Sequence, residues 1–222
     1  MLGTYVNVIA IIVGSLIGLL FGSKLSVKYT KTIQEAMALA IIAIGVMSAI
    51  KMTEPVLIFV SLLIGALIGE FIGLDNLLTR LGTFLQTKFK SGNISKGFIT
   101  ATLVYCVGAL AIYGSIESGI NGDHSTLYLK SVIDGITSII FASTLGLGVL
   151  LSAIPVLIYQ GSITLLASFV GSNIPDIAIT NMTAIGGILL VGIALNILNI
   201  TKIRLTNLIP ALFIPIIYYL IF

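Results

Sequence analysis

The sequence predicts an all-α membrane protein with about eight transmembrane helices joined by short connections. Of its 222 residues, 58% are hydrophobic and only 9% are charged, and the mean hydropathy is +1.19. Soluble proteins carry about 25% charged residues, so this chain has far more apolar surface than a water-soluble fold can bury. Because each span takes roughly 20 residues, no length remains for a separate soluble domain. We therefore expect residues 1–222 to form a single integral membrane domain.

Runs of apolar residues place the expected spans along the chain. They cover residues 3–22, 33–50, 55–74, 97–116, 126–144, 147–171, 178–198 and 205–222. The stretch from 126 to 171 is interrupted only by Gly146-Leu147-Gly148, so it holds either two full spans or one span and a re-entrant segment. Pro155, Pro210 and Pro215 lie within spans, where a proline frees a backbone carbonyl, so we expect some helices to be kinked or broken.

The basic residues favour eight spans and suggest their direction. With eight spans, one set of alternate loops holds nine of the 11 cations, and that side should face the cytoplasm. The nine are Lys24, Lys28, Lys31, Arg80, Lys88, Lys90, Lys96, Lys202 and Arg204, whereas the other side has only Lys51 and Lys130. Both chain termini would then be extracytoplasmic.

Residues 76–90 predict an amphipathic helix at the cytoplasmic membrane surface. Leu77, Leu81 and Phe84 recur at helical spacing and would form the apolar face. Arg80 and Lys88 would lie on the polar face. A helix with one apolar and one basic face lies in the interface between lipid and water.

Two glycine stripes predict close helix packing. GSLIGLLFG and GALIGEFIG share five of nine residues, including three glycines spaced by four. Such spacing exposes bare backbone on one helix face, so that a neighbouring helix can approach closely. The stripes either pack helices within one chain or form the seam of a homodimer. They consist of Gly14, Gly18 and Gly22, and of Gly65, Gly69 and Gly73.

A second similarity raises the question of internal repeats. MALAIIAIGVMSAI in the second span resembles MTAIGGILLVGIALNIL in the seventh. The two segments are five spans apart, and an odd offset reverses their direction in the membrane. The sequence therefore admits inverted repeats, which many transporters contain.

Acidic residues in or near the spans are the first candidates for a binding site. Asp134 lies inside the fifth span, while Glu117 and Asp123 flank the glycine-rich segment GSIESGINGDHS at the outer surface. An acidic pocket partly removed from water can bind a proton or a small cation, because ionisable groups in lipid are costly and are usually functional. Lys130 is one helical turn from Asp134, so the alternative is a structural ion pair between the two without further role.

Uncharged polar residues extend the candidate site. Gln160, Asn7 and Asn181 lie within spans and can either bind a solute or join helices by hydrogen bonds. Glu70 interrupts the second glycine stripe near the cytoplasmic end of its span, where it can equally reach the headgroups.

Several classes of chemistry are disfavoured. His124 is the only histidine and Cys106 the only cysteine, which excludes a multi-histidine metal site and a disulfide within the chain. The sequence has neither a P-loop nor a GxSxG motif. We expect no enzyme activity, no cofactor, no metal site and no nucleic-acid partner; the expected partners are the lipid bilayer and a small solute or ion.

The residues also resemble a known family. The segments that carry the likeness are GTYVNVIAIIVGSLIG, GSIESGINGD, KSVIDGITSIIFASTLGLGVLLSAIPVLIYQGSITLLA and AIGGILLVGIALNIL. They look like the YdfK/YqgA-like family of bacterial inner-membrane proteins of unknown function, sometimes described as transporters. The resemblance covers nearly the whole chain and implies a bacterial cytoplasmic membrane, but it supplies no substrate and no functional residue.

Two classes of function remain open. Acidic and amide residues within spans, kinked helices and the repeat-like segments favour a secondary transporter or permease for a small solute or ion. Tight glycine packing and the amphipathic helix would suffice for a scaffold, a sensor or an assembly partner that transports nothing.

Overall fold

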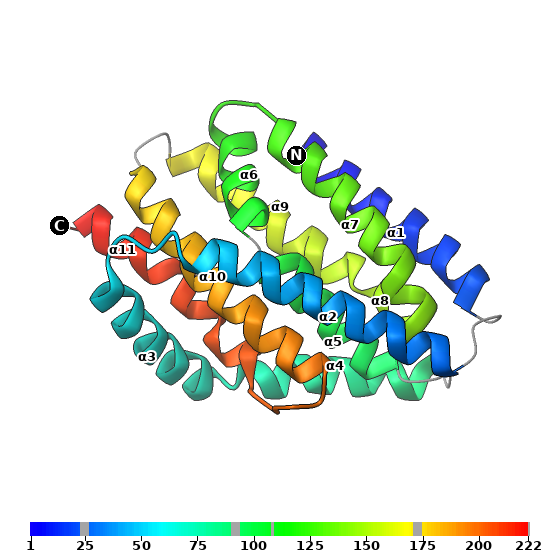
Figure 1. Ribbon diagram of the computed structural model, residues 1–222. Coiled ribbons are helices and arrows are strands. Elements are labelled where there is room, and N and C mark those ends of the chain that lie inside the picture. The colour runs from blue at the N-terminus through cyan, green and yellow to red at the C-terminus, as the bar shows by residue number, and fades with distance from the viewer. Residues whose placement is uncertain (23–26, 90–93, 108, 171–174, 222) are drawn as a thin grey trace. The chain divides into compact units, whose positions relative to one another are not determined.

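The computed structural model describes residues 1–22, 27–89, 94–107, 109–170 and 175–221, and all its regular elements in these ranges are helices (Figure 1). In chain order they are α1 (Leu2–Gly22), α2 (Val27–Ala49), α3 (Pro55–Ile72), α4 (Leu74–Phe89), α5 (Ile94–Val107), α6 (Ala109–Ile120), α7 (Ser125–Leu145), α8 (Gly148–Leu151), α9 (Ala153–Val170), α10 (Asp176–Ile197), the 3₁₀ helix η1 (Leu205–Phe213) and α11 (Ile214–Ile221). The predicted all-α class is confirmed for this part of the chain.

Five helices of the described ranges are long and apolar enough to cross a bilayer. They are Leu2–Phe21, Lys31–Ala49, Pro55–Ile72, Gly148–Phe169 and Asp176–Ile197. Residues 94–106 and 110–120 add a sixth span if they are taken together, although their axes differ by 72°. The predicted number of eight spans is therefore not confirmed, and neither are the inverted repeats.

Two of the predicted spans, residues 126–144 and 205–222, are not among these five long apolar helices and differ from them physically. Helix α7 has 21 residues, but Lys130, Asp134 and its hydroxyl side chains lower its hydropathy. The last predicted span is a nine-residue 3₁₀ helix followed by eight α-helical residues. Because a 3₁₀ helix rises about 2.0 Å per residue and an α-helix about 1.5 Å, this segment still extends about 30 Å, the thickness of the hydrocarbon core.

The prolines disturb the helices less uniformly than expected. Pro155 is the third residue of α9, in the first turn, where the missing N–H has no helical acceptor in any case. The apolar span Gly148–Phe169 is interrupted at Ser152, three residues before Pro155, which has no N–H to donate to the Leu151 carbonyl, so the break lies where the sequence predicted a disturbed helix. Pro210 lies inside η1, and Pro215 is the second residue of α11.

The chain divides into two compact units, which we describe separately. Unit 1 comprises residues 1–35, 79–106 and 110–171, and unit 2 comprises residues 36–78, 107–109 and 172–222. Helices α2, α4, α5 and α6 have residues in both units. The predicted single membrane domain stays a prediction.

In unit 1, α1 lies along α7 over most of its length (Figure 1). Gly3 contacts Leu127, Gly14 lies against Gly135, and Gly18 lies against Ile139. The positions increase together in both helices, so α1 and α7 are parallel. The hydroxyls of Thr4 and Thr164 are 3.5 Å apart and Asn7 contacts Gln160, so α9 is antiparallel to α1. Residues 126–170 thus hold α7, the short α8 and α9, with α7 and α9 antiparallel, and the choice between two full spans and one span with a re-entrant segment stays open.

The inner face of α1 is small and polar, whereas its outer face is large and apolar. The buried positions recur every three or four residues: Gly3, Thr4, Asn7, Ile11, Gly14, Ser15 and Gly18. Leu2, Ile9, Val13, Leu16 and Leu20 are exposed. In lipid, apolar side chains gain little by association, so close backbone contact and hydrogen bonds hold the helices together.

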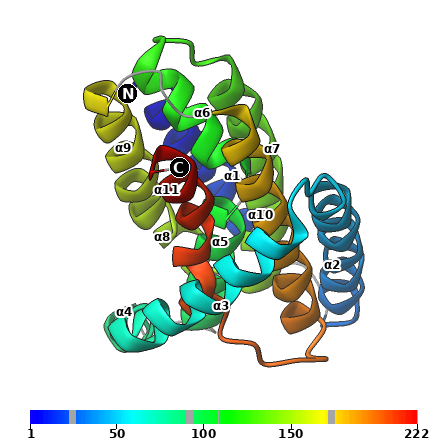
Figure 2. The ribbon, with the colours of Figure 1, turned by 90° about the vertical axis from the view of Figure 1, so that its left-hand side faces the viewer.

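Unit 2 contains two antiparallel contacts between helices. Gly45 of α2 and Gly187 of α10 each face the other's carbonyl oxygen. Helix α3 lies beside η1, with Gly65 against Ala211 and Gly69 against the backbone of Asn207 (Figure 2). Gly73 ends α3 with a positive φ of 73°, a conformation that favours glycine. Gly22 is the last residue of α1, and its surroundings lie outside the described part.

These contacts predict that the glycine positions tolerate no added methyl group. A Cβ at Gly18 or Gly69 would collide with the carbonyl oxygen of Ile139 or Asn207, respectively. We expect Gly18→Ala and Gly69→Ala each to lower the free energy of unfolding by about 1–3 kcal/mol, the usual cost of overpacking. Thermal unfolding in detergent measures this change.

Gly161→Ala is the matched control within a helix. Its added Cβ would meet only the terminal methyl of Met1, at 3.4 Å, and alanine favours the helix by about 1 kcal/mol. The packing argument fails if all three variants unfold at the temperature of the wild type.

Candidate functional site

Three side chains from separate helices of unit 1 meet in its interior. The amide nitrogen of Asn7 on α1 donates to Asp134 Oδ2 on α7 at 3.1 Å and to Gln160 Oε1 on α9 at 3.2 Å. Asn7 lies 127 positions before Asp134 and 153 before Gln160, so only the tertiary packing brings them together. Three of the six predicted binding residues thus form one cluster, which we call the Asn7 cluster and define as Asn7, Lys130, Asp134 and Gln160.

A buried ion pair forms the charged part of the Asn7 cluster. Lys130 and Asp134 lie one turn apart on α7, and Lys130 Nζ contacts Asp134 Oδ2. Only 4% of Lys130 and 6% of Asp134 is exposed. The Lys130 ammonium also lies 5.9 Å from the ring centroid of Tyr105, within the range of a cation–π interaction. Asp134 is therefore paired in this structure, as the alternative interpretation of the sequence expected.

The amide part of the cluster is incompletely hydrogen-bonded. Asn7 and Gln160 are fully buried, yet Asn7 Oδ1 and Gln160 Nε2 have no hydrogen-bond partner within the described residues. A buried polar atom without a partner costs about 1–3 kcal/mol. The cluster therefore presents one unpaired acceptor and one unpaired donor beside an ion pair.

The close approach of α1 to α7 determines where Asn7 lies. Gly14 and Gly18 let the α1 backbone reach the carbonyls of α7, and Gly135 faces Ala10 in return. Asn7 is on the same face as Gly14, two turns earlier, so its short side chain can reach Asp134. One turn further along α7, Ser138 forms a hydrogen bond of 2.8 Å with Tyr105 of α5, which continues the polar interior.

Glu117 and Asp123 form other contacts, at the connection between α6 and α7. Glu117 Oε2 accepts a hydrogen bond from the Thr126 hydroxyl at 2.7 Å. Asp123 is exposed and accepts hydrogen bonds from the hydroxyl and the backbone N–H of Ser125. The Ser125 hydroxyl, and then its N–H, lower the pKa of the Asp123 carboxyl, because both stabilise the ionised form.

Asn181 lies in unit 2 and caps the start of α3. Its Oδ1 accepts hydrogen bonds from the backbone N–H groups of Thr53 and Glu54 and from the Thr53 hydroxyl, at 3.0–3.3 Å. The first N–H groups of a helix have no acceptor within it, so a buried amide in this position stabilises the turn. The geometry is that of a helix cap, and Asn181 is not part of the Asn7 cluster.

Asn207 was not singled out by the sequence analysis. Its Nδ2 donates to Glu70 at 2.6 Å, and its Oδ1 accepts the backbone N–H of Asp75 at 2.7 Å. Glu70 also pairs with Arg204 at 2.8 Å, so this glutamate is held by the η1 side of unit 2. The glycine at position 69 was the available signal, because it faces Asn207.

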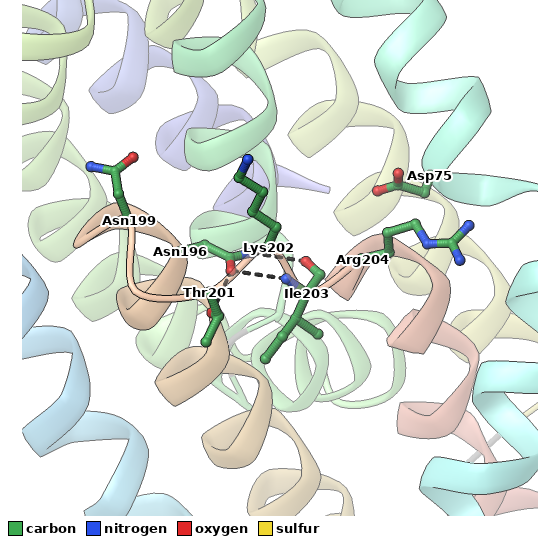
Figure 3. A pocket seen from close by; sticks show the side chains of 7 residues that line it. All are labelled: Asp75, Asn196, Asn199, Thr201, Lys202, Ile203 and Arg204. Atoms are coloured by element: carbon green, nitrogen blue, oxygen red, sulfur yellow. Dashed lines mark hydrogen bonds between the residues drawn. The ribbon is translucent and has the colours of Figure 1, made fainter.

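An open hollow of about 300 Å³ lies where α10 leads into η1, also in unit 2. Its lining residues are Asp75, Asn196, Asn199, Thr201, Lys202, Ile203 and Arg204 (Figure 3). The Asn196 amide holds this turn by hydrogen bonds with Thr201 and with both backbone groups of Ile203. Its polar groups are thus largely occupied by the turn itself, and we do not assign it a ligand.

No metal centre is formed in the described part of the chain. No group of three or more His, Cys, Asp or Glu side chains lies close enough there to hold an ion. Cys106 is buried and free.

Comparison with known proteins confirms the family resemblance. Residues 2–220 match the family described as "Protein of unknown function (DUF554)". The "Uncharacterized membrane protein YdfK" of Bacillus subtilis (strain 168) is 37% identical over 97% of this chain and 94% of its own length. The "Uncharacterized protein YqgA" of Escherichia coli (strain K12) is 27% identical over 95% and 93%. No solved structure matches the chain. Together with the apolar helices, these matches identify a membrane protein.

The buried ion pair predicts a strong coupling between Lys130 and Asp134. Removing one partner leaves a buried charge unpaired, so we expect Lys130→Met or Asp134→Leu to lower the free energy of unfolding by about 3–5 kcal/mol. The double variant should lose far less than the sum, because apolar replacement of both partners is often neutral. A double-mutant cycle from unfolding in one detergent measures the coupling, and additive losses would contradict the pairing.

Proposed function

The chain belongs to the DUF554 family of proteins of unknown function, and we propose that it is a secondary transporter or permease for a small solute or ion in the bacterial cytoplasmic membrane. The observation that carries the proposal is the Asn7 cluster. A buried charged pair and two incompletely bonded amides lie together in the interior of unit 1. Such groups are expensive within a bilayer and typically mark a pathway for substrates or ions.

The location of the whole Asn7 cluster in one compact unit is compatible with a transport cycle. Alternating access usually moves one helical bundle against another around a binding site. The Asn7 cluster belongs entirely to unit 1, so all its hydrogen bonds can persist while this unit moves as one body. Interrupted helices commonly occur near transporter sites, and unit 1 contains an interruption at Ser152, between α8 and α9.

We further propose eight membrane crossings with both termini outside the cytoplasm. The roughly 30 Å extent of η1 with α11 makes a final crossing physically feasible. The distribution of Lys and Arg supports the direction, and α4 would then lie at the cytoplasmic surface, with Leu77, Leu81 and Phe84 exposed toward lipid. Inverted repeats remain part of this proposal, supported by the antiparallel pairing of α2 with α10 through Gly45 and Gly187.

In this topology, Glu117 and Asp123 would lie at the extracytoplasmic entrance. They would attract cations toward the Asn7 cluster without binding substrate in its interior. The protein would need neither enzyme activity nor a cofactor. The homodimer stays a prediction, because the structure contains a single chain.

The proposed orientation predicts which positions a membrane-impermeant thiol reagent reaches in intact cells. Asp123→Cys should react, whereas Lys88→Cys should react only after the membrane is opened; both native side chains are exposed and lie outside the long apolar helices. Cys106 is buried, so the unchanged protein is a suitable background. Labelling of Lys88→Cys in intact cells would contradict the proposed topology and indicate the opposite orientation.

The transport proposal predicts solute uptake that depends on the cluster. Proteoliposomes with the wild-type protein should accumulate at least one member of a panel of labelled amino acids, organic acids, amines, sugars and monovalent cations. Asn7→Leu should abolish that uptake, because it removes both hydrogen bonds of the cluster's central amide. Asn121→Leu changes an exposed asparagine of unit 1 outside the cluster and should retain it. Absence of uptake across the panel would instead favour a scaffold, sensor or assembly partner.

A further inference from the structure

We propose that the Asn7 cluster binds a small zwitterion, a solute that carries one ammonium and one carboxylate group, as an α-amino acid does. The inference rests on the proposed transport function and names its substrate class. It follows from the polar groups of the cluster, which leave one donor and one acceptor unpaired and carry one charge of each sign.

The charges of the cluster favour a ligand with no net charge. Lys130 and Asp134 neutralise one another, and both are buried. Binding of a cation or an anion alone would leave a net charge in a medium of low dielectric constant, where an unpaired ion is strongly disfavoured. A zwitterion can separate the pair, with its carboxylate on Lys130 and its ammonium on Asp134. Two ion pairs then replace one, and the site remains neutral.

The unpaired amide atoms require the same two kinds of partner. Gln160 Nε2 is a donor and can bond a ligand carboxylate, whereas Asn7 Oδ1 is an acceptor and can bond a ligand ammonium. Asn7 also contacts Asp134 directly, so the two acceptors are adjacent. A solute with only one of the two charged groups would leave one amide atom unpaired. Sites built from polar groups discriminate strongly against ligands that lack a partner for them.

A neutral amide or alcohol is the principal alternative occupant. It could complete Asn7 Oδ1 and Gln160 Nε2 while the pair of Lys130 and Asp134 stayed closed. Water could do the same, because buried waters commonly bond otherwise unpaired polar atoms. Neither occupant uses the ion pair, so dependence on both ligand charges distinguishes the zwitterion from them.

The test measures thermal stabilisation of the purified full-length protein in lipid nanodiscs at neutral pH. The probes are the standard amino acids, β-alanine and glycine betaine, together with acetate, propionate, ethylamine and propionamide, which carry one charge or none. A ligand that binds the folded state raises the melting temperature with a saturable dependence on concentration. We expect at least one zwitterion to do so, and the single-charge and neutral analogues to fail.

Two variants locate the binding. Gln160→Leu should weaken the zwitterion at least about tenfold, the equivalent of one hydrogen bond. Gln34→Leu removes a partly buried glutamine of unit 1 whose amide bonds the Thr144 carbonyl, outside the cluster, and should bind like the wild type. If Gln160→Leu does not fold, the ligand panel on the wild type still decides the chemical class.

Three results would overturn the inference. They are no shift with any zwitterion, an equal shift with acetate, ethylamine or propionamide, and a zwitterion shift that Gln160→Leu leaves unchanged. Uptake in proteoliposomes of another solute class, lost in Asn7→Leu, would leave the transport proposal standing while the zwitterion fails. If no solute shifts the melting temperature and none is taken up, both the zwitterion inference and the transport proposal are contradicted.

Discussion

The pairing of Lys130 with Asp134 is the interaction on which the interior of unit 1 depends. Neither charge could lie in an apolar environment alone, because the free-energy cost of removing it from water would exceed the free energy gained from packing. The pair needs further hydrogen bonds, and Asn7 supplies one from α1. Asn7 can reach it only because Gly14 and Gly18 allow the two parallel helices to touch. The ion pair therefore depends on the Asn7 amide, and the position of Asn7 depends on the two glycines.

Unit 2 solves the same problem with different groups. Glu70 is held between Arg204 and Asn207, which lie on the turn and the 3₁₀ helix that follow α10. Asn207 also accepts a hydrogen bond at the start of α4, and Asn181 accepts hydrogen bonds at the start of α3. Most polar atoms of these side chains are hydrogen-bonded, although Asn181 Nδ2 has no partner within the described residues. The Asn7 cluster differs because it contains a buried ion pair and leaves both an unpaired donor and an unpaired acceptor beside it.

Hydropathy and charge in the sequence predicted the helical class, the membrane environment and an amphipathic helix near 76–90, which corresponds to α4. The pairing of Lys130 and Asp134 was open to prediction because residues four apart share a helix face. The contact of Asn7 with Gln160 was not, since it spans 153 positions and depends on tertiary packing. Propensity alone did not predict the 3₁₀ conformation of η1 either, because packing of neighbouring elements can override local preference, whereas the helix break at Ser152 lies beside Pro155, where the sequence predicted a kinked or broken helix.

The most direct test of the buried ion pair is the infrared spectrum of the protein in lipid nanodiscs, compared with that of Asp134→Asn. If Lys130 and Asp134 form a charged pair, the difference spectrum should show loss of the stretching bands of one ionised carboxylate. These bands should persist when the sample is exchanged into D₂O at neutral pH. Loss of a protonated carboxyl band instead would mean that both groups are neutral, and it would contradict the account of the site.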